Sequence, residues 1–445
     1  MDLSLRIGEL LLDNGAGAAD VTATMQAVGF HFGLAHPIVD VTFTTLSMSY
    51  QEAPDTVPVM QIRTVKQRDI DYEDLTRVDH LVRDILADRM DLAEARAAVA
   101  QITSSGHHRN RLAVTAGWGV MCAGVALMLG GGAIVSAIAF TAAVLIDRLQ
   151  TWMSRRRLPT FYLQVMGGAV ATVLAVATAA VDWDVDPSLV VTSNIIMLLS
   201  GIGFMGGLQD ALTGFYLTAG ARMTEALLST AGIIAGVSGG LALGGVLGVD
   251  LGRLNPGAFG LESWPVLALG AAIAAAGFAF ASYSPKRVLI PIAMIAAVAI
   301  LITNGVELAG FGRPWAVATA AFVVGLVAYS VAGMVRVPPL VVVVSAVVPL
   351  LPGLSIYRGL SLLAEGGTMT SRGLLAIVTA ASVALSIAAG VILGEYVAQP
   401  LKREARKLET RLSGPRLVGP LRIRNGRASR KARRQTAGAD DTADS

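Results

Sequence analysis

The sequence predicts a polytopic α-helical membrane protein, in which ten transmembrane helices form a 5+5 inverted repeat that follows a small α+β cytoplasmic domain. Three observations lead to this prediction. First, 54% of the 445 residues are hydrophobic and only 15% are charged, whereas roughly 25% are charged in soluble domains. Second, charges are concentrated toward the two ends of the chain, and long apolar runs fill the middle. Third, two similar stretches recur at matching places in that middle.

Changes in composition divide the chain into four parts. Residues 1–111 hold 16 acidic and 10 basic residues, and this density of charge is typical of a soluble domain. Residues 112–252 and 253–398 are predicted to be the first and the second five-helix repeat. Residues 399–445 include a run with 13 Lys or Arg between Lys402 and Arg434, and we expect this part to be a basic, disordered cytoplasmic tail.

The N-terminal part has the predicted order ααββαα. Its helical segments show the apolar spacing of amphipathic helices, and a glycine directly follows the first two. Its two strand segments alternate in polarity and are rich in β-branched residues, which predicts a hairpin. The expected elements are helices at residues 3–14 and 18–32, strands at 39–50 and 57–65, and helices at 72–88 and 91–103.

This N-terminal part carries all five histidines but no recognised catalytic motif. Within residues 1–111 the strings HExxH and GxSxG and a Walker-type phosphate loop do not occur, which argues against a site of the enzyme classes that use them in this part of the chain. Cys122 is the single cysteine, so neither an internal disulfide nor a CxxC site can form. His107 and His108 lie beside Arg109 and Arg111, a pattern that favours a solvated cluster near the membrane over a metal site. We therefore expect no metal, no cofactor and no enzymatic activity, and a regulatory or structural role for this domain.

Ten apolar segments, separated by short loops, are expected to cross the membrane. A transmembrane helix needs roughly 20 apolar residues, because backbone polar groups cannot stay unpaired in lipid. The second and the seventh segments are the shortest. The segments are residues 112–130, 131–146, 161–181, 189–208, 226–249, 265–283, 288–303, 314–334, 337–354 and 374–397.

The chain is expected to be an inner-membrane protein, and the distribution of basic residues predicts that both of its termini lie in the cytoplasm. With the N-terminus inside, the inner loops carry eight Lys or Arg and the outer loops carry four, as the positive-inside rule requires. An even number of spans also leaves the basic tail inside, where anionic lipid headgroups attract it. Lipid binding by the tail is therefore favoured over nucleic-acid binding.

Two stretches, one in each half of the apolar part, resemble each other. An alignment of Gly207 with Gly353 also matches Gly220 with Gly366. Each stretch follows an apolar run interrupted by Gly or Pro, and each precedes the last helix of its half. Five spans per half is an odd number, so the halves are inverted relative to each other, as in secondary transporters whose site lies where interrupted segments meet. Kinked helices that pack through small residues would give the same pattern. The stretches are residues 206–228 and 352–375.

Three groups of motifs follow one another along nearly the whole chain: residues 8–15 (GELLLDNG) with 18–21 and 39–50, residues 207–214 (GLQDALTG) with 220–222, and residues 351–354 (LPGL) with 357–359 and 390–394. Together with the order of a soluble domain and two sets of five spans, they resemble the threonine/serine exporter family. The resemblance implies proton-driven export of small hydroxylated amino acids from the cytoplasm. The family pattern has Pro-Gly in both halves, whereas the first half here has Gly206-Gly207, which leaves the sharpness of the break in the fourth span open.

A zwitterionic hydroxy amino acid needs an anion site, a partner for its ammonium group and a partner for its hydroxyl group. Arg side chains and helix N-termini can supply the first, carboxylates the second, and Ser, Thr or Asn the third. Ionisable groups in membrane segments are functional candidates by default. The residues expected to bind the substrate or the coupling ion are Asp210, Glu225, Arg222, Arg358, Gly206, Gly207, Pro352, Gly353, Ser193, Asn194, Thr224, Ser355 and Thr370.

Asp210 is expected to carry the coupling proton or to hold the substrate ammonium, with Arg222 or Arg358 as its partner. An equally simple interpretation places Asp210 at the level of the headgroups with no role in transport. Glu395, one turn from the end of the last span, is expected to extend toward the membrane surface rather than to relay a proton. Two other classes of function stay open: a membrane-bound hydrolase whose site includes His80, and an uncoupled channel or sensor.

Overall fold

The computed structural model describes the N-terminal part, the helices of the apolar part and many of the turns between them. The described residues are 1–53, 55–65, 70–107, 109–180, 186–199, 201–246, 248, 263–352, 355, 358–359, 362 and 367–405. The predicted tail beyond residue 405 and the predicted boundary between residues 252 and 253 lie outside them.

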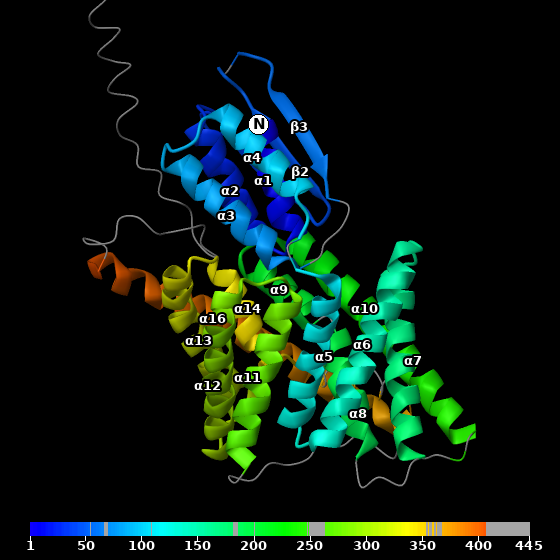
Figure 1. Ribbon diagram of the computed structural model, residues 1–445. Helices are drawn as coiled ribbons and strands as arrows, with labels where there is room; N and C mark the ends of the chain where they lie inside the picture. Colours follow the sequence, from blue (N-terminus) through cyan, green and yellow to red (C-terminus); the bar gives the residue numbers. More distant parts are fainter. Residues whose placement is uncertain are drawn as a thin grey trace, which may run out of the picture.

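Four helices and a three-stranded sheet form residues 1–107, which we call the head. The strands follow the order β1-β2-β3, and both pairs are antiparallel. Leu46 and Met48 of the central strand are fully buried, because the helices lie together on one side of the sheet (Figure 1). The elements are α1 (Asp2–Asp13), α2 (Ala18–His31), β1 (Ile38–Val41), β2 (Thr45–Tyr50), β3 (Val59–Thr64), α3 (Tyr72–Leu86) and α4 (Leu92–Ser104).

The sheet has one strand more than the sequence predicts. Residues 39–50 were expected to form a single strand, but a tight turn divides them into β1 and β2. The backbone N–H and the hydroxyl of Thr42 both donate to the carbonyl of Thr45, over 2.9 and 3.2 Å, so the chain reverses within three residues. The predicted order ααββαα is therefore wrong, and the observed order is ααβββαα.

Eight helices are long and apolar enough to cross a membrane, which confirms a polytopic helical membrane protein. Two further segments match the predicted fourth and ninth spans. The fourth is a pair of helices, α8 (Pro187–Leu198) and α9 (Gly201–Leu212), bent by 44°. The ninth is the short α14 (Pro339–Val347) with the 3₁₀ turn η3 (Val348–Leu350). By length and composition the described helices thus provide eight spans, or nine if the bent pair counts as one. The eight are α5 (Arg111–Met128), α6 (Ala133–Arg155), α7 (Thr160–Ala179), α10 (Tyr216–Val246), α11 (Trp264–Ala281), α12 (Leu289–Leu308, after η2 at Lys286–Val288), α13 (Arg313–Val335) and α16 (Thr370–Ala405, after η4 at Gly367–Met369).

Helix α10 begins ten residues earlier than the sequence predicts, at residue 216 rather than 226. Gly214 has φ of +94° and ends α9, since glycine adopts this conformation without steric cost. The amide of Phe215 then donates to the carbonyl of Asp210, and the chain re-enters a helix at once. As a result Arg222, one of the eight basic residues counted in the predicted inner loops, lies inside α10.

Glycines bring three pairs of helices into close contact. A β-carbon at Gly270 of α11 would meet the backbone of Met128 in α5, one at Gly236 of α10 would meet α7, and one at Gly394 of α16 would meet α13. Such small residues let helix backbones approach closely within a membrane. The pairs α5–α11, α7–α10 and α13–α16 are accordingly the most closely packed in the bundle.

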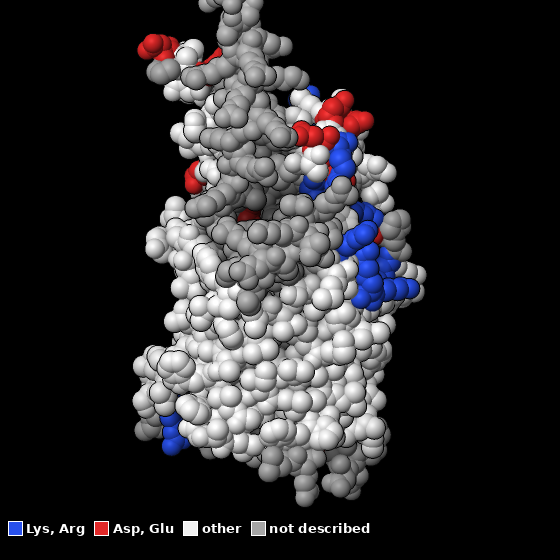
Figure 2. Space-filling view, turned by 90° about the vertical axis from the view of Figure 1, so that its left-hand side faces the viewer, with Lys and Arg blue, Asp and Glu red and all other residues white. Residues whose placement is uncertain are grey.

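The head lies on one end of the bundle, above α9 and α14 (Figure 1). The amide of Tyr72, at the start of α3, donates to the carbonyl of Ser282. Arg109 donates to the carbonyls of Phe280, in the last turn of α11, and Ser284, just after that helix. In Figure 2, basic side chains gather where the head meets the bundle, and the broad middle of that face shows no charged side chain in colour.

Candidate functional site

A cavity of about 330 Å³ lies between the head and the bundle. Its volume is at the small end of the range for small-molecule sites. The head contributes Leu12, Gly15, Gly17 and Tyr72 to its lining, and Trp118, Met121 and Phe278 supply an apolar wall. The polar side chains from α7, α9 and α10 that line it are Thr160, Gln164, Gln209, Arg222, Glu225 and Ser229.

Both interrupted spans reach this cavity. At the end of α8 the chain leaves the helix at Leu199 (φ −66°, ψ 126°), and after η3 it does so at Leu351 (φ −60°, ψ 137°). Leu199 and Leu351 both line the cavity. Backbone that lacks helical hydrogen bonds is tolerated at membrane depth only where protein or a water-filled cavity covers it. The position of the cavity beside both breaks meets this requirement.

Asp210 and Arg222 connect the bundle to the head. Asp210 is 1% exposed, and one carboxylate oxygen accepts the backbone N–H of Ala18, the first residue of α2, at 3.0 Å. The other oxygen lies 3.1 Å from the guanidinium of Arg222. Arg222 in turn donates to the carbonyl of Ala16 at 3.0 Å. The expected pairing of Asp210 with Arg222 is thus present, and both partners also hold the turn before α2.

The two glycines of the first motif shape the space around Arg222. A β-carbon at Gly206 would lie 2.8 Å from a guanidinium nitrogen of Arg222, so the absence of a side chain leaves room for that group. A β-carbon at Gly207 would lie 3.2 Å from the carbonyl of Ala219, which keeps α9 close to α10.

Of the twelve predicted residues that the structure describes, three line the cavity: Gly206, Arg222 and Glu225. In α8, Ser193 and Asn194 are fully buried and donate to the carbonyl of Val190 in their own helix. Thr224 is exposed and bonds to Gly220 of its own helix. Of the others, Pro352 is buried, Ser355 and Arg358 are half-buried, Thr370 is exposed at the start of α16, and Gly353 lies outside the described residues.

Sequence reasoning missed several groups that the structure brings to this region. Gln164 is the single amide within the third apolar segment, and Gln209 directly precedes Asp210. An isolated polar residue in a membrane segment is the signal that could have identified them. Glu395 was expected to extend toward the membrane surface, but it is 3% exposed, so that prediction is wrong.

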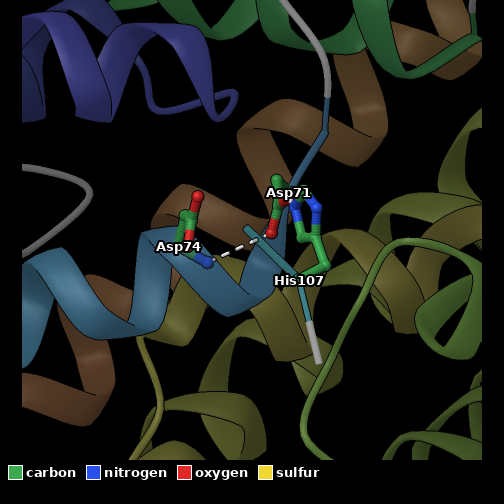
Figure 3. Close-up of side chains that lie close together, drawn as sticks. All are labelled: Asp71, Asp74 and His107. Atoms are coloured by element: carbon green, nitrogen blue, oxygen red, sulfur yellow. Dashed lines mark hydrogen bonds and ion pairs between the residues drawn. The ribbon is translucent and has the colours of Figure 1, made fainter. Parts of the chain in front are cut away.

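A second polar cluster joins the head to the loop after α11. Asp71 caps α3 by accepting the amides of Glu73 and Asp74, and its other oxygen contacts the imidazole of His107 (Figure 3). The ring of His107 stacks on Tyr283 with centroids 4.1 Å apart. His107 is exposed, as expected for a solvated cluster near the membrane, and its stacking on Tyr283 also joins the head to the bundle. His108 lies outside the described residues.

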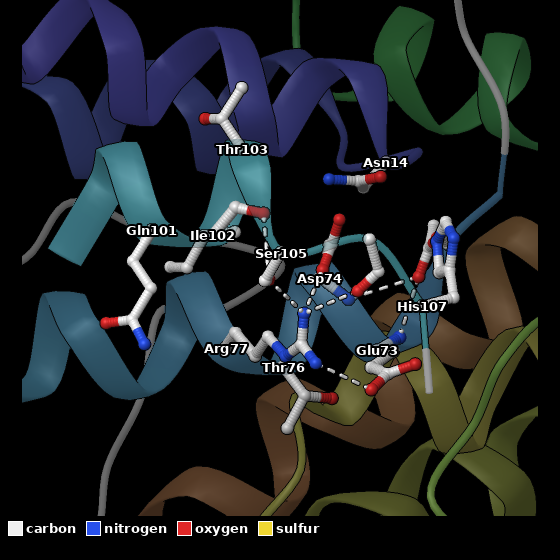
Figure 4. Close-up of polar contacts among 12 residues, drawn as sticks. Asn14, Glu73, Asp74, Thr76, Arg77, Gln101, Ile102, Thr103, Ser105 and His107 are labelled. Atoms are coloured by element: carbon white, nitrogen blue, oxygen red, sulfur yellow. Dashed lines mark hydrogen bonds and ion pairs between the residues drawn. The ribbon is translucent and has the colours of Figure 1, made fainter. Parts of the chain in front are cut away.

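Ligand atoms of Asp71, Asp74 and His107 lie within 4.8 Å of one another, a spacing that a metal ion could use. Each carboxylate already has donors, however. Asp74 accepts from Arg77 at 3.0 Å, and Arg77 also reaches Glu73 and Ser105 (Figure 4). Burial and the neighbouring Asp71 raise the pKa of the Asp74 carboxyl, against the opposing effect of Arg77. The cluster is best described as an ion-pair network between α3, the end of α4 and the loop after α11.

Comparison with known proteins identifies the family. The family model described as "Threonine/Serine exporter, ThrE" matches residues 267–397, and a companion model, ThrE, whose description also names a threonine/serine exporter, matches residues 2–244. The "Probable threonine/serine exporter" of Mycobacterium tuberculosis is 35% identical over 426 residues, covering 93% of this chain and 80% of that protein. The "Threonine/serine exporter" of Corynebacterium glutamicum is 33% identical over 415 residues, covering 91% and 84%. No solved structure matches the chain significantly.

Both relatives are named as transporters rather than enzymes, in agreement with the prediction that the chain is not an enzyme. The two family models together extend over the head and the helices of both halves. The resemblance inferred from the sequence motifs is confirmed, and the chain belongs to the threonine/serine exporter family.

Proposed function

We propose that this protein exports threonine and serine from the cytoplasm across the bacterial inner membrane, driven by the proton gradient. The observation that carries the proposal is the cavity at the two interrupted spans, with polar side chains on α7, α9 and α10, in a chain of this family. Both termini would lie in the cytoplasm, which the excess of basic residues in the predicted inner loops supports. The head would then cover the cytoplasmic opening of the cavity.

The polar lining suits a zwitterionic amino acid with a hydroxyl group. Arg222, Glu225 and Ser229 stand three and four residues apart on α10 and therefore share one face of that helix. Arg222 would bind the substrate carboxylate, since a guanidinium has five N–H donors and Asp210 and Ala16 use only part of them. Glu225 would accept the ammonium, and Ser229 with Gln164 or Gln209 would bind the hydroxyl. One positive and one negative group match the two charges of the substrate.

An inverted repeat would let the cavity open alternately to the two sides. The α8–α9 break and the break after η3 occupy equivalent places in the two halves, and the close pairs α7–α10 and α13–α16 are also equivalent. Gly117 and Gly124 of α5 face Gly277 and Gly270 of α11, as expected if the first helices of the two halves meet near a pseudo-two-fold axis. These three correspondences support the 5+5 arrangement.

Transport into inverted membrane vesicles tests the proposal. With a pH gradient imposed, labelled threonine should accumulate, and serine should compete with it better than alanine or valine, because a site built to bind a hydroxyl disfavours analogues that lack it. Glu225→Gln should weaken apparent affinity about 10- to 100-fold, since hydrogen bonds to charged groups contribute ~1.5–3 kcal/mol. Glu52→Gln, at an exposed position of the head, is the matched control.

Three results would contradict the proposal. Wild-type affinity in Glu225→Gln would mean that the substrate does not use the cavity. Threonine flux indifferent to the pH gradient would indicate an uncoupled channel. Equal competition by valine and serine would exclude a site for the hydroxyl group.

A further inference from the structure

One side of α6 faces away from the rest of the bundle and carries two arginines. Residues at intervals of three and four share one face of a helix, and the residues on this side, which we call the α6 stripe, are Leu145, Arg148, Trp152 and Arg155. Leu145 is 47% exposed and Trp152 is 56% exposed, whereas Ile146, on the opposite side, is fully buried. Because α6 is long and apolar enough to cross a membrane, the α6 stripe is the part of this helix that lipid would contact.

Arg148 is half-buried and has no counter-charge in the described part of the protein. It lies seven residues before Arg155, the last residue of α6, which is about 10 Å along the helix. Among the described residues, no hydrogen bond or ion pair reaches its guanidinium group, and the Nη2 atom is shielded from solvent. The neighbouring Asp147 pairs instead with Arg111, at 2.6 Å. An unpaired charge at this depth is costly, so we expect a partner from outside the chain.

Further positive charge gathers where α6 ends. Arg155, Arg156 and Arg157 follow one another, and all three are exposed. The C-terminal end of a helix favours cations, so this run by itself needs no ligand. The guanidinium group of Arg156, however, lies over the ring of Trp152, 5.5 Å from its centroid, which directs one of these charges toward the α6 stripe. Within the ranges that the structure describes, none of the three belongs to an ion pair, so no carboxylate balances this charge.

We propose that the α6 stripe binds an anionic phospholipid from the leaflet on the head side of the membrane. Tryptophan side chains favour the level of the lipid headgroups, so a lipid at Trp152 has its phosphate between the guanidinium groups of Arg148 and Arg155. A guanidinium group can donate two parallel hydrogen bonds to a phosphate, and an acyl chain of the lipid would lie along Leu145. This binding does not depend on threonine export, so either proposal can fail without the other.

The charge balance at this end of α6 favours a lipid with a net negative headgroup. Residues 148–157 contain four arginines and no acidic residue. A zwitterionic lipid brings a positive group of its own close to Arg155 and Arg156, whereas phosphatidylglycerol brings only the negative phosphate. Basic sites beside membrane helices on the cytoplasmic side bind acidic headgroups for this reason. Phosphatidylglycerol is therefore the probe that should distinguish the α6 stripe from an ordinary lipid-facing surface.

Tryptophan fluorescence of the purified full-length protein tests the proposal. The protein is reconstituted into phosphatidylcholine vesicles with rising fractions of phosphatidylglycerol brominated on its acyl chains, since bromine quenches a tryptophan that it contacts. The wild type should show saturable quenching, and Trp152→Phe should lack this component. Arg148→Gln should need about ten times more of the lipid, the effect of losing one hydrogen bond to a charged group, and Arg148→Lys should lie between the two. Arg372→Gln, which removes an exposed arginine at the start of α16, is the matched control and should bind as the wild type does.

Several results would overturn the proposal. Brominated phosphatidylcholine that quenches the wild type at the same fraction would remove the preference for an anionic headgroup, and this comparison needs no variant. Equal losses in Arg148→Gln and Arg372→Gln would reduce the effect to general surface charge, and quenching that persists in Trp152→Phe would place the lipid elsewhere. Displacement of the lipid by inorganic phosphate would assign Arg148 to a free anion. Arg155→Gln changes an exposed residue at the helix end and should also weaken binding, so wild-type affinity in this variant and in Arg148→Gln would leave no lipid site.

Discussion

Replacement of Asp210 by Asn should loosen the head from the bundle. The amide oxygen of Asn can still accept the N–H of Ala18, but the charge that balances Arg222 is lost. Removing one partner of a buried ion pair costs about 3–5 kcal/mol. The guanidinium of Arg222 also faces the cavity and is 11% exposed, so the lower end of that range applies. A cost of about 3 kcal/mol corresponds to a roughly 100-fold shift of the docking equilibrium.

Hydrogen exchange of the full-length protein in detergent measures this shift. Amides at the start of α2 should lose about 100-fold in protection in Asp210→Asn. Asp147→Asn is a matched control, because Asp147 is also buried and pairs with an arginine, Arg111, at 2.6 Å within the bundle. This control should destabilise the bundle without exposing α2. Protection of α2 within twofold of the wild type in Asp210→Asn would refute the assigned contact.

The role of Asp210 in transport is a separate question. If it holds Arg222 in place, Asp210→Asn should weaken both threonine affinity and coupling in inverted vesicles. Undiminished proton-coupled uptake in this variant would remove Asp210 from the mechanism and leave it as a structural contact of the head.

Three further predictions follow from the same contacts. Gly206→Ala should displace Arg222, because the new β-carbon would lie 2.8 Å from its guanidinium. The apparent KM for threonine should then rise about tenfold, which is the effect of losing one charge-assisted hydrogen bond. Gly220→Ala is the control, because this position has open space around it, and it should leave KM unchanged. Asp20→Asn should raise the thermal unfolding temperature at pH 8 more than at pH 5. The reason is that the pKa of Asp20 is raised in the folded protein, so its carboxyl group lowers the stability of the fold increasingly as the pH rises above the ordinary Asp range. An equal change at both pH values would contradict this prediction. His80→Ala should keep transport within about fivefold of the wild type, since it removes one exposed hydrogen bond, to the carbonyl of Arg336, that contributes about 1 kcal/mol. A complete loss of activity would show that His80 is essential.

The helices of this protein are largely readable from the sequence because their determinants are local. Apolar runs of suitable length predict membrane helices, and all ten predicted segments contain helix, including the two interrupted ones. In the head, Asp71 and Asp91 are side-chain caps at the starts of α3 and α4, and these helices begin within a residue of their predicted positions. The division of residues 39–50 into two strands was missed, because a three-residue turn between threonines carries no Gly or Pro signal.

The candidate site depends on contacts that local patterns do not contain. Asp210 binds Ala18 across 192 positions of sequence, and Arg222 binds Ala16 across 206. The sequence alone determined that Asp210 and Arg222 were unusual, since charges in membrane segments are costly, but only the tertiary structure decided that they hold the head. It also decided which candidates share a cavity, and that Glu395 is buried rather than exposed. The physical reason is that burial and electrostatic pairing arise from the packing of distant segments, whereas hydropathy and helix periodicity are properties of neighbouring residues.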